Sequence, residues 1–279
     1  MPITLMYITN DPKIAAIAQD AGVDRVWVDM EYKGKEERQA GMNTVKSKHT
    51  VEDVKRLRPL LTSSTLQVRV NPLDDNSETE INEVIAAGAD YVMLPMFRTK
   101  SEVERFISLV GGRAKTILLL ETAEAAENIE DYIDCQGIDE IHIGLNDLHL
   151  SYGKTFMFEL LTDGTVDRLS RVLTAHGKRF GFGGIARIGY GMLPAEMILT
   201  QHYALGSQMA ILSRGFCDAN LVDDPETVRE DFVMGVRRIR EKEMEIKSYS
   251  TDDYLKNYSE IVPRVNQIVE MIKAKRTNQ

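Results

Sequence analysis

The chain has 279 residues, of which 43% are hydrophobic and 28% charged, and its formal net charge is −9 at pH 7. This length suits one α/β barrel, which commonly takes about 250 residues. The acidic balance excludes a typical nucleic-acid binder or a binder of anionic membranes, because it offers no basic surface to neutralise phosphates. The sequence holds no run of 18 apolar residues and no secretory signal pattern, so we expect a cytoplasmic protein with no membrane partner.

Short apolar runs alternate along the chain with segments whose apolar residues recur at helical spacing. This alternation is typical of parallel strands joined by crossover helices. Asn10-Asp11-Pro12, and Ser77 followed by Glu80, have the form of helix starts. In chain order, the pattern predicts eight strands: 5–9, 25–30, 65–71, 91–96, 116–121, 140–145, 180–185 and 208–212. No Gly-x-Gly-x-x-Gly opens the first helix, so closure into a (β/α)8 TIM barrel is favoured over an open nucleotide-binding sheet.

Two parts of the chain fall outside the eightfold repeat. Residues 33–49 form a polar stretch, and residues 218–279 form a charged tail. Apolar residues such as Phe232, Val236 and Ile239 recur in the tail at helical spacing, so one of its faces should pack on another surface. We predict a single domain with a barrel core over 1–217. A C-terminal helical extension over 218–279 would pack on the barrel or on a partner subunit of a homo-oligomer.

Acidic residues stand where two neighbouring strands are predicted to end. Glu121 closes the apolar run 116–120, and Asp147 follows the next strand. The carboxyl ends of barrel strands converge, so the two carboxylates can reach one point, where they must repel, share a proton or bind a cation. Oxygen ligands with positions left for water and substrate suit Mg²⁺ or Mn²⁺ better than Zn²⁺. As an alternative, each acid could cap the helix that follows it.

Arg69 lies inside the apolar third strand, where a guanidinium is costly to bury unless an anion meets it. One interpretation is an internal salt bridge with Asp29 or Glu31, at the end of the second strand. In the other interpretation, Arg69 holds a substrate carboxylate or a developing enolate oxygen. Both can apply at different stages of one reaction.

The strand ends carry recognisable short segments. They are Leu120-Glu121-Thr122, Ile143-Gly144-Leu145-Asn146-Asp147-Leu148, Val68-Arg69-Val70-Asn71, Leu94-Pro95-Met96 and Val28-Asp29-Met30-Glu31. Over most of residues 4–217 the chain thereby resembles the HpcH/HpaI aldolase and citrate lyase family of pyruvate- and phosphoenolpyruvate-type barrels. The resemblance implies that Glu121 and Asp147 bind the divalent metal and that Arg69 holds the carbonyl or enolate oxygen. It also implies substrate contacts for four further residues: Asp29, Pro95, Gly144 and Asn146.

The activity implied by this resemblance is that of a metal-dependent carbon–carbon lyase, similar to a class II pyruvate aldolase. Such an enzyme cleaves or forms a 4-hydroxy-2-oxo acid through a metal-stabilised pyruvate enolate. The cofactor would be Mg²⁺ or Mn²⁺, and the partner a small 2-oxo acid or a related anionic substrate.

The chain departs from the family at the general base. Many of the family's aldolases carry a histidine directly after the strand-two glutamate, and here Tyr32 follows Glu31. Leu119 also stands where a glutamine is frequent. The acid or base could be Tyr32, Glu31 or His149, which lies two residues beyond Asp147.

These departures leave two alternatives open. One is a citrate-lyase-like enzyme acting on a CoA thioester, or an enzyme that uses phosphoenolpyruvate. The other is a non-catalytic barrel that serves as a binding or assembly subunit. Glycine-rich loops after strands seven and eight, with Arg187 and Arg214, occupy the place where barrels often hold a phosphate.

Overall fold

Nine short parallel strands form the core of the described part of the chain. The computed structural model describes residues 2–34, 49–213, 216 and 224–277. The strands are β1 (Thr4–Ile8), β2 (Arg25–Asp29), β3 (Thr65–Arg69), β4 (Tyr91–Leu94), β5 (Lys115–Leu120), β6 (Glu140–Ile143), β7 (Arg179–Phe182), β8 (Gly184–Ile185) and β9 (Met209–Leu212). Their order across the sheet is β7-β6-β5-β4-β3-β2-β1-β9-β8.

The sheet closes into a barrel through its seventh strand. β7 and β8 stand at opposite ends of the strand order, although only Gly183 separates them in the sequence. The backbone N–H of Gln208, just before β9, donates to the carbonyl of Phe180 in β7 at 2.8 Å. The predicted strand 180–185 is therefore split in two by a bend at Gly183, where φ is +47°. The prediction of a (β/α)8 barrel is confirmed.

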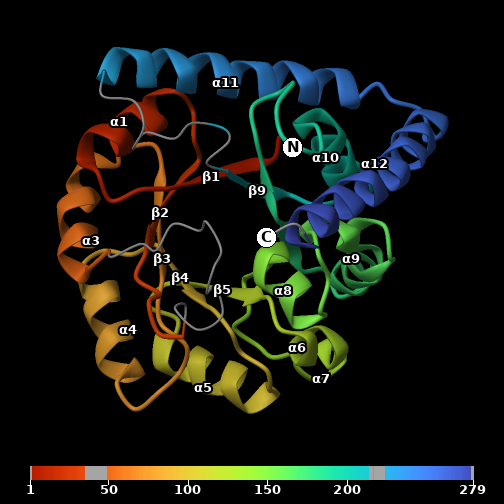
Figure 1. Ribbon diagram of the computed structural model, residues 1–279. Coiled ribbons are helices and arrows are strands. Elements are labelled where there is room, and N and C mark those ends of the chain that lie inside the picture. Colours follow the sequence, from red (N-terminus) through yellow and green to blue (C-terminus); the bar gives the residue numbers. More distant parts are fainter. Residues whose placement is uncertain (1, 35–48, 214–215, 217–223, 278–279) are drawn as a thin grey trace.

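Helices follow the strands and surround the barrel (Figure 1). They are α1 (Pro12–Asp20), α3 (Val51–Leu57), α4 (Ser77–Ala86), α5 (Lys100–Val110), α6 (Ala123–Glu127), α7 (Ile129–Tyr132), α8 (Leu145–Ser151), α9 (Thr165–Ala175), α10 (Ala195–Ala204), α11 (Pro225–Ile246) and α12 (Thr251–Thr277), with the 3-10 helices η1 (Arg58–Leu60) and η2 (Met157–Leu161). The predicted start of α1 is confirmed, since the Asp11 side chain accepts hydrogen bonds from the backbone N–H groups of Lys13 and Ile14.

The predicted capping of α4 by Ser77 and Glu80 is wrong. Ser77 is the first residue of the helix, and its hydroxyl accepts a hydrogen bond from the N–H of Asp74 in the preceding loop at 2.8 Å. The Glu80 carboxylate accepts from the Asn71 side chain at 2.7 Å and from the Asn71 backbone at 3.1 Å. Both side chains hold the loop after β3, so neither is available to cap the helix.

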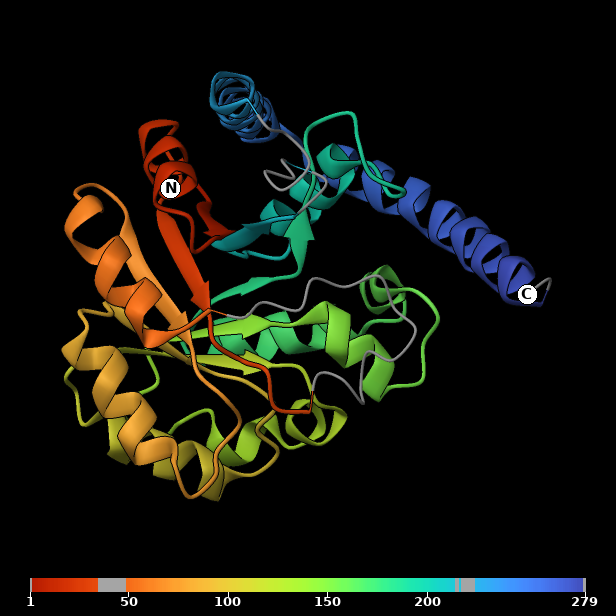
Figure 2. The ribbon, with the colours of Figure 1, turned by 60° about the vertical axis from the view of Figure 1, so that its left-hand side comes forward.

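The C-terminal helices pack on the last and first helices of the barrel. α11 lies against α1 and α10, and α12 lies against α10 and η2. Figure 2 shows α12 running away from the strands to the C-terminal end. Glu243 joins α11 to the barrel, because its carboxylate accepts from the N–H of Ile3 at 2.6 Å and from the hydroxyl of Tyr203 in α10 at 3.0 Å. The predicted boundary at 217/218 lies outside the described residues, as do 35–48 of the polar stretch.

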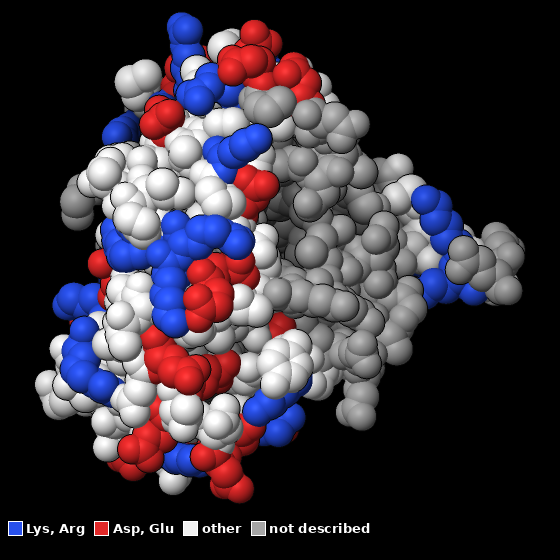
Figure 3. Space-filling view, turned by 90° about the vertical axis from the view of Figure 1, so that its left-hand side faces the viewer, with Lys and Arg blue, Asp and Glu red and all other residues white. Residues whose placement is uncertain are grey.

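On the face drawn in Figure 3, acidic and basic side chains are interspersed. Within the described ranges, no helix is long and apolar enough to cross a membrane.

Side chains alternate along each strand between the barrel interior and the side that faces the helices. The large apolar cluster between strands and helices includes Val26, Val28, Leu66 and Val68. A separate apolar cluster fills the interior: Trp27, Met93, Ile117 and Leu119. Asp29 lies two residues after Trp27, so the same alternation turns it into the interior.

A buried ion-pair network occupies the interior where the strands begin. Arg25 in β2 donates to the two carboxylate oxygens of Glu140 in β6, at 2.8 and 3.2 Å, and to Gln67 at 3.0 Å. Arg179 in β7 contacts the same carboxylate. The Arg25 guanidinium lies 3.7 Å from the centre of the Tyr91 ring. Since Arg25 and Glu140 are both buried, each charge depends on the other for compensation.

Two buried histidines are held in their neutral form. The His142 Nε2 atom lies 3.2 Å from the carbonyl of Gly183. The His202 Nδ1 atom lies 2.7 Å from the Ser207 hydroxyl, and its ring stacks on Phe182 at 3.8 Å. Burial lowers the pKa of each imidazole to about 3. Folding therefore excludes a proton that each histidine would bind at mildly acidic pH in the unfolded chain.

We expect these histidines to make the fold sensitive to acid. The unfolded imidazoles titrate near pH 6.5, so their effect is absent above that pH, and stability falls as the pH drops toward 3. Each contributes a slope of about 1.4 kcal/mol per pH unit in this window. Urea unfolding of wild type and His202→Gln at several pH values measures this slope. In the variant, the free energy of unfolding should fall less steeply with decreasing pH, by about 1.4 kcal/mol per pH unit. Identical slopes in the two proteins would contradict the expectation.

Candidate active site

Charged side chains from four strands meet at the end of the barrel where the strands finish, which we call the mouth. Asp29 and Arg69 are the last residues of β2 and β3, and they are register partners. Glu121 directly follows β5. Asp147 lies in the first turn of α8, which begins immediately beyond β6. The parallel sheet thus brings residues that are more than a hundred positions apart to one end of the barrel.

Arg69 is held by two carboxylates. Its Nε and Nη2 atoms donate to the two oxygens of Asp29 at 2.8 and 2.9 Å, and Nη1 lies 3.2 Å from Glu31 Oε2. Burial alone would lower the pKa of Arg69, but the charges of Asp29 and Glu31 outweigh it and raise that pKa above its ordinary value. The ring of Trp27 lies 5.2 Å from the guanidinium. Of the two interpretations of Arg69, the structure shows the internal salt bridge.

Glu121 is 3% exposed and is contacted on two sides. The N–H of Met96, just beyond β4, donates to Glu121 Oε1 at 3.2 Å. A Cβ atom at Gly144 would lie 2.9 Å from both Cβ and Oε2 of Glu121, so only glycine leaves room for this carboxylate. Glu121 does not cap α6, because Thr122 occupies the cap position and accepts from the N–H of Ala125. The helix-capping alternative is therefore wrong for Glu121.

The two acids of the mouth interact electrostatically. Burial raises the pKa of Glu121 well above its ordinary value, and the negative charge of Asp147 raises it further, against an opposing effect of Arg69. Asp147 itself is half-buried. The α8 cap position is taken by Gly144, so Asp147 does not act as the cap either. Two carboxylates in a poorly solvated place repel each other, and a cation between them would relieve that repulsion.

The donor set suits a hard divalent cation with an incomplete protein shell. In the part of the chain that the structure describes, no three or more His, Cys, Asp or Glu residues form a group able to hold a metal by themselves. Glu121 and Asp147 would supply two oxygen ligands, with other positions open to water or substrate, as Mg²⁺ and Mn²⁺ sites often have.

The other predicted site residues differ in their placement. Glu31 is 1% exposed and contacts Arg69, whereas Tyr32 is 63% exposed. His149 is buried, and its Nδ1 atom lies 3.1 Å from the carbonyl of Leu145 in its own helix. Burial lowers the pKa of His149. Pro95 is buried beside Met96, and Asn146 is exposed next to Asp147.

The predicted phosphate position is only partly described. Arg187 pairs with Asp231 of α11 at 2.7 Å and lies 5.0 Å from the Tyr190 ring centre. Arg214 lies outside the described residues. Arg187 therefore already has a carboxylate partner.

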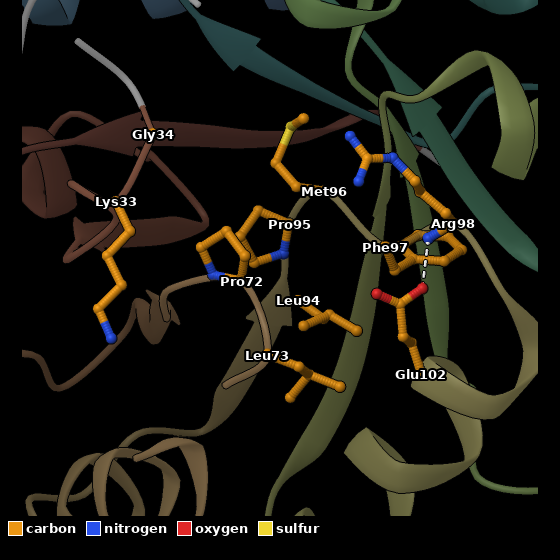
Figure 4. Close-up of a pocket in the computed structure, with 10 residues that line it drawn as sticks. All are labelled: Lys33, Gly34, Pro72, Leu73, Leu94, Pro95, Met96, Phe97, Arg98 and Glu102. Atoms are coloured by element: carbon orange, nitrogen blue, oxygen red, sulfur yellow. Dashed lines mark hydrogen bonds between the residues drawn. The ribbon is translucent and has the colours of Figure 1, made fainter. Parts of the chain in front are cut away.

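A cavity of about 430 Å³ lies beside the mouth, between the loops that follow β2, β3 and β4. Figure 4 shows its apolar residues between Lys33 on one side and Arg98 on the other; the apolar lining consists of Pro72, Leu73, Leu94, Pro95, Met96 and Phe97. The Lys33 ammonium pairs with Asp74. Met96 both lines this cavity and donates to Glu121, so the cavity and the mouth share a wall. Sequence patterns contain no signal for this cavity, because its lining comes from three separate loops.

Comparisons with known proteins place the chain among related sequences and folds. The family model described as HpcH/HpaI aldolase/citrate lyase matches residues 3–179. An HpcH/HpaI aldolase from Desulfitobacterium hafniense DCB-2 is 16% identical with a TM-score of 0.58, over 86% of this chain and 93% of that one. An HpcH/HpaI aldolase/citrate lyase family protein from Burkholderia cenocepacia J2315 is 15% identical with a TM-score of 0.60, over 88% and 95%.

A structure titled citrate synthase SbnG is 19% identical with a TM-score of 0.60, over 82% of this chain and 94% of that one. At such identities, these likenesses show the shared fold. No curated protein sequence matches the chain.

Proposed function

The chain belongs to the HpcH/HpaI aldolase/citrate lyase family, and we propose that it is a divalent-metal-dependent carbon–carbon lyase acting on a 4-hydroxy-2-oxo acid. One observation carries the proposal: the buried carboxylate of Glu121 follows β5 and Asp147 follows the neighbouring strand β6, at a mouth that also holds Arg69. Such a cluster is hard to explain by packing, because buried like charges oppose folding unless a ligand uses them.

Glu121 and Asp147 would hold the metal, with Gly144 leaving the space that the Glu121 carboxylate needs. A bound Mg²⁺ or Mn²⁺ ion would polarise the ketone of a 2-oxo acid and favour negative charge on its oxygen. The Met96 N–H and the close approach of Gly144 orient the Glu121 carboxylate before the substrate arrives, so this group needs little reorganisation during the reaction.

Arg69 would bind the oxygen that gains negative charge when the carbon–carbon bond breaks. Its bidentate pair with Asp29 keeps the guanidinium plane in one orientation. The guanidinium has more N–H groups than its contacts with Asp29 and Glu31 use, so it can donate to a substrate oxygen without releasing either carboxylate. Asp29 thus acts as a positioning residue for Arg69.

Glu31 is the best-placed group to take the proton from the 4-hydroxyl group on cleavage and to return it on condensation. It is buried at the mouth and touches Arg69. His149 would first have to leave the carbonyl of Leu145. The exposed ring of Tyr32 would have to turn inward.

The cavity beside the mouth favours a second candidate activity. Its volume of about 430 Å³ is larger than a three-carbon 2-oxo acid needs, so it has room for an extended second substrate. Such a substrate could be the CoA thioester of a citrate-lyase-like reaction. A reaction with phosphoenolpyruvate is a related alternative, since it leads to the same enolate.

A ligand panel tests the proposal and separates it from the second candidate. We expect Mn²⁺ with oxalate to raise the melting temperature by at least about 4 °C, because ligand at a hundred times its Kd stabilises by about 2.7 kcal/mol. The same panel contains pyruvate, phosphoenolpyruvate and acetyl-CoA. Release of pyruvate from 4-hydroxy-2-oxopentanoate should stop in excess chelator and return with Mn²⁺. Full turnover in chelator would refute metal dependence.

A further inference from the structure

Met96 has a backbone conformation that ordinary residues avoid. Its φ is +55°, and among the described residues it is the one non-glycine residue with a positive φ. A side chain in this left-handed region is disfavoured by about 1–2 kcal/mol. Glycine would adopt the conformation at little cost, yet the chain has a methionine, whose side chain lines the cavity beside the mouth.

The strained segment is attached to the strand end that carries Glu121. The Met96 N–H donates to Glu121 Oε1 at 3.2 Å. One residue further, the carbonyl of Phe97 accepts from the Thr122 hydroxyl at 2.7 Å. Two consecutive residues after β4 therefore bind two consecutive residues after β5, and Phe97 and Thr122 are both buried.

Glu121 is consequently confined from two directions. The backbone N–H of Met96 binds Oε1. On the other side, the carboxylate packs against Gly144, where a Cβ atom would lie 2.9 Å from Oε2. A carboxylate at the end of a flexible side chain would otherwise lose rotamer freedom whenever it bound a ligand.

We infer that Met96 is a positioning residue whose left-handed backbone aims its N–H at Glu121 and so orients that carboxylate for a divalent cation. The inference rests on the proposed metal site. It predicts that the backbone conformation at residue 96 matters for metal affinity, and that the chemical nature of the side chain does not.

Three substitutions separate backbone from side chain. Met96→Gly allows the same φ without a side chain. Met96→Ala keeps a Cβ and therefore the same conformational cost at positive φ. Met96→Val adds a β-branch that the left-handed region excludes. Calorimetric titration with MnCl₂ should give Gly and Ala variants within about twofold of the wild-type Kd, whereas Val should weaken it about tenfold or more. Wild-type affinity in a folded Val variant, or equal losses in all three, would overturn the inference.

Amide hydrogen exchange tests the contact itself, with no metal present. The Met96 amide should be protected in the wild-type protein and should exchange faster in Glu121→Ala. The Val70 amide, which donates to the carbonyl of Met93 at 3.1 Å, serves as the internal control and should not change. Equal Met96 protection in both proteins would overturn the inference even if the Val variant does not fold. Absence of Mn²⁺ binding by the wild type would refute the proposed function, while the exchange result still decides the role of Met96.

Discussion

Replacing Glu121 and Asp147 together with alanine is expected to abolish Mn²⁺ binding and to lower turnover at least about 1,000-fold. The magnitude follows from the several kcal/mol by which a metal stabilises developing charge on a carbonyl oxygen. Calorimetry with MnCl₂ measures the binding, and pyruvate release from 4-hydroxy-2-oxopentanoate measures turnover. As a matched control, Asp252→Ala with Glu270→Ala removes two exposed acids of α12 and should change neither quantity.

The same double variant separates a functional role from a structural one. Burial and the charge of Asp147 both disfavour ionised Glu121. Removal of the pair should therefore leave the melting temperature of the metal-free protein unchanged or higher. A large fall in that temperature would show that the two acids serve the fold. Full activity of the folded variant would exclude them as metal ligands.

Replacing Glu140 with leucine is expected to lower the free energy of unfolding by about 3–5 kcal/mol, because it leaves Arg25 buried without its carboxylate partner. Urea unfolding at pH 7 measures the loss. Glu241→Leu removes an acid of similar size from the exposed pair with Arg237, and it should cost less than about 1 kcal/mol.

A second readout checks whether this network is purely structural. Glu140 begins β6, at the opposite end of the barrel from the mouth, so Mn²⁺ affinity of the folded variant should stay at the wild-type value. The double variant Arg25→Met with Glu140→Leu should recover part of the lost stability, since it removes the unpaired charge. A double variant less stable than Glu140→Leu alone would contradict the desolvation argument.

The repeating pattern along the chain was sufficient to predict the barrel, because strand and helix periods are local properties. It also located each strand start closely, for example at Arg25 and Thr65. The split of the seventh strand was not predictable, since nothing in the sequence distinguishes Gly183 from the other glycines of the same glycine-rich segment. The bend there arises from closure, in which β7 must pair with β6 while β8 pairs with β9.

For the site, the local sequence identified the acids at the strand ends but not the contacts that their side chains make. That Glu121 and Asp147 lie near a common point follows from neighbouring strands in any such barrel. Their role as metal ligands stays a prediction. The exposure of Tyr32 and the hydrogen bond of His149 to its own helix depend on loop conformations, which carry no periodic signal.

The sequence by itself thus determined the fold class, the family resemblance and the presence of charged residues at the mouth, because these depend on residue types at regular spacing. Only the tertiary structure decided how those residues act on one another. The pairing of Arg69 with Asp29 requires the β2–β3 register. The hydrogen bond from Met96 to Glu121 goes with a positive φ at residue 96, which a methionine in the sequence does not predict. Both are contacts across strands, where small shifts in backbone position decide which atoms meet.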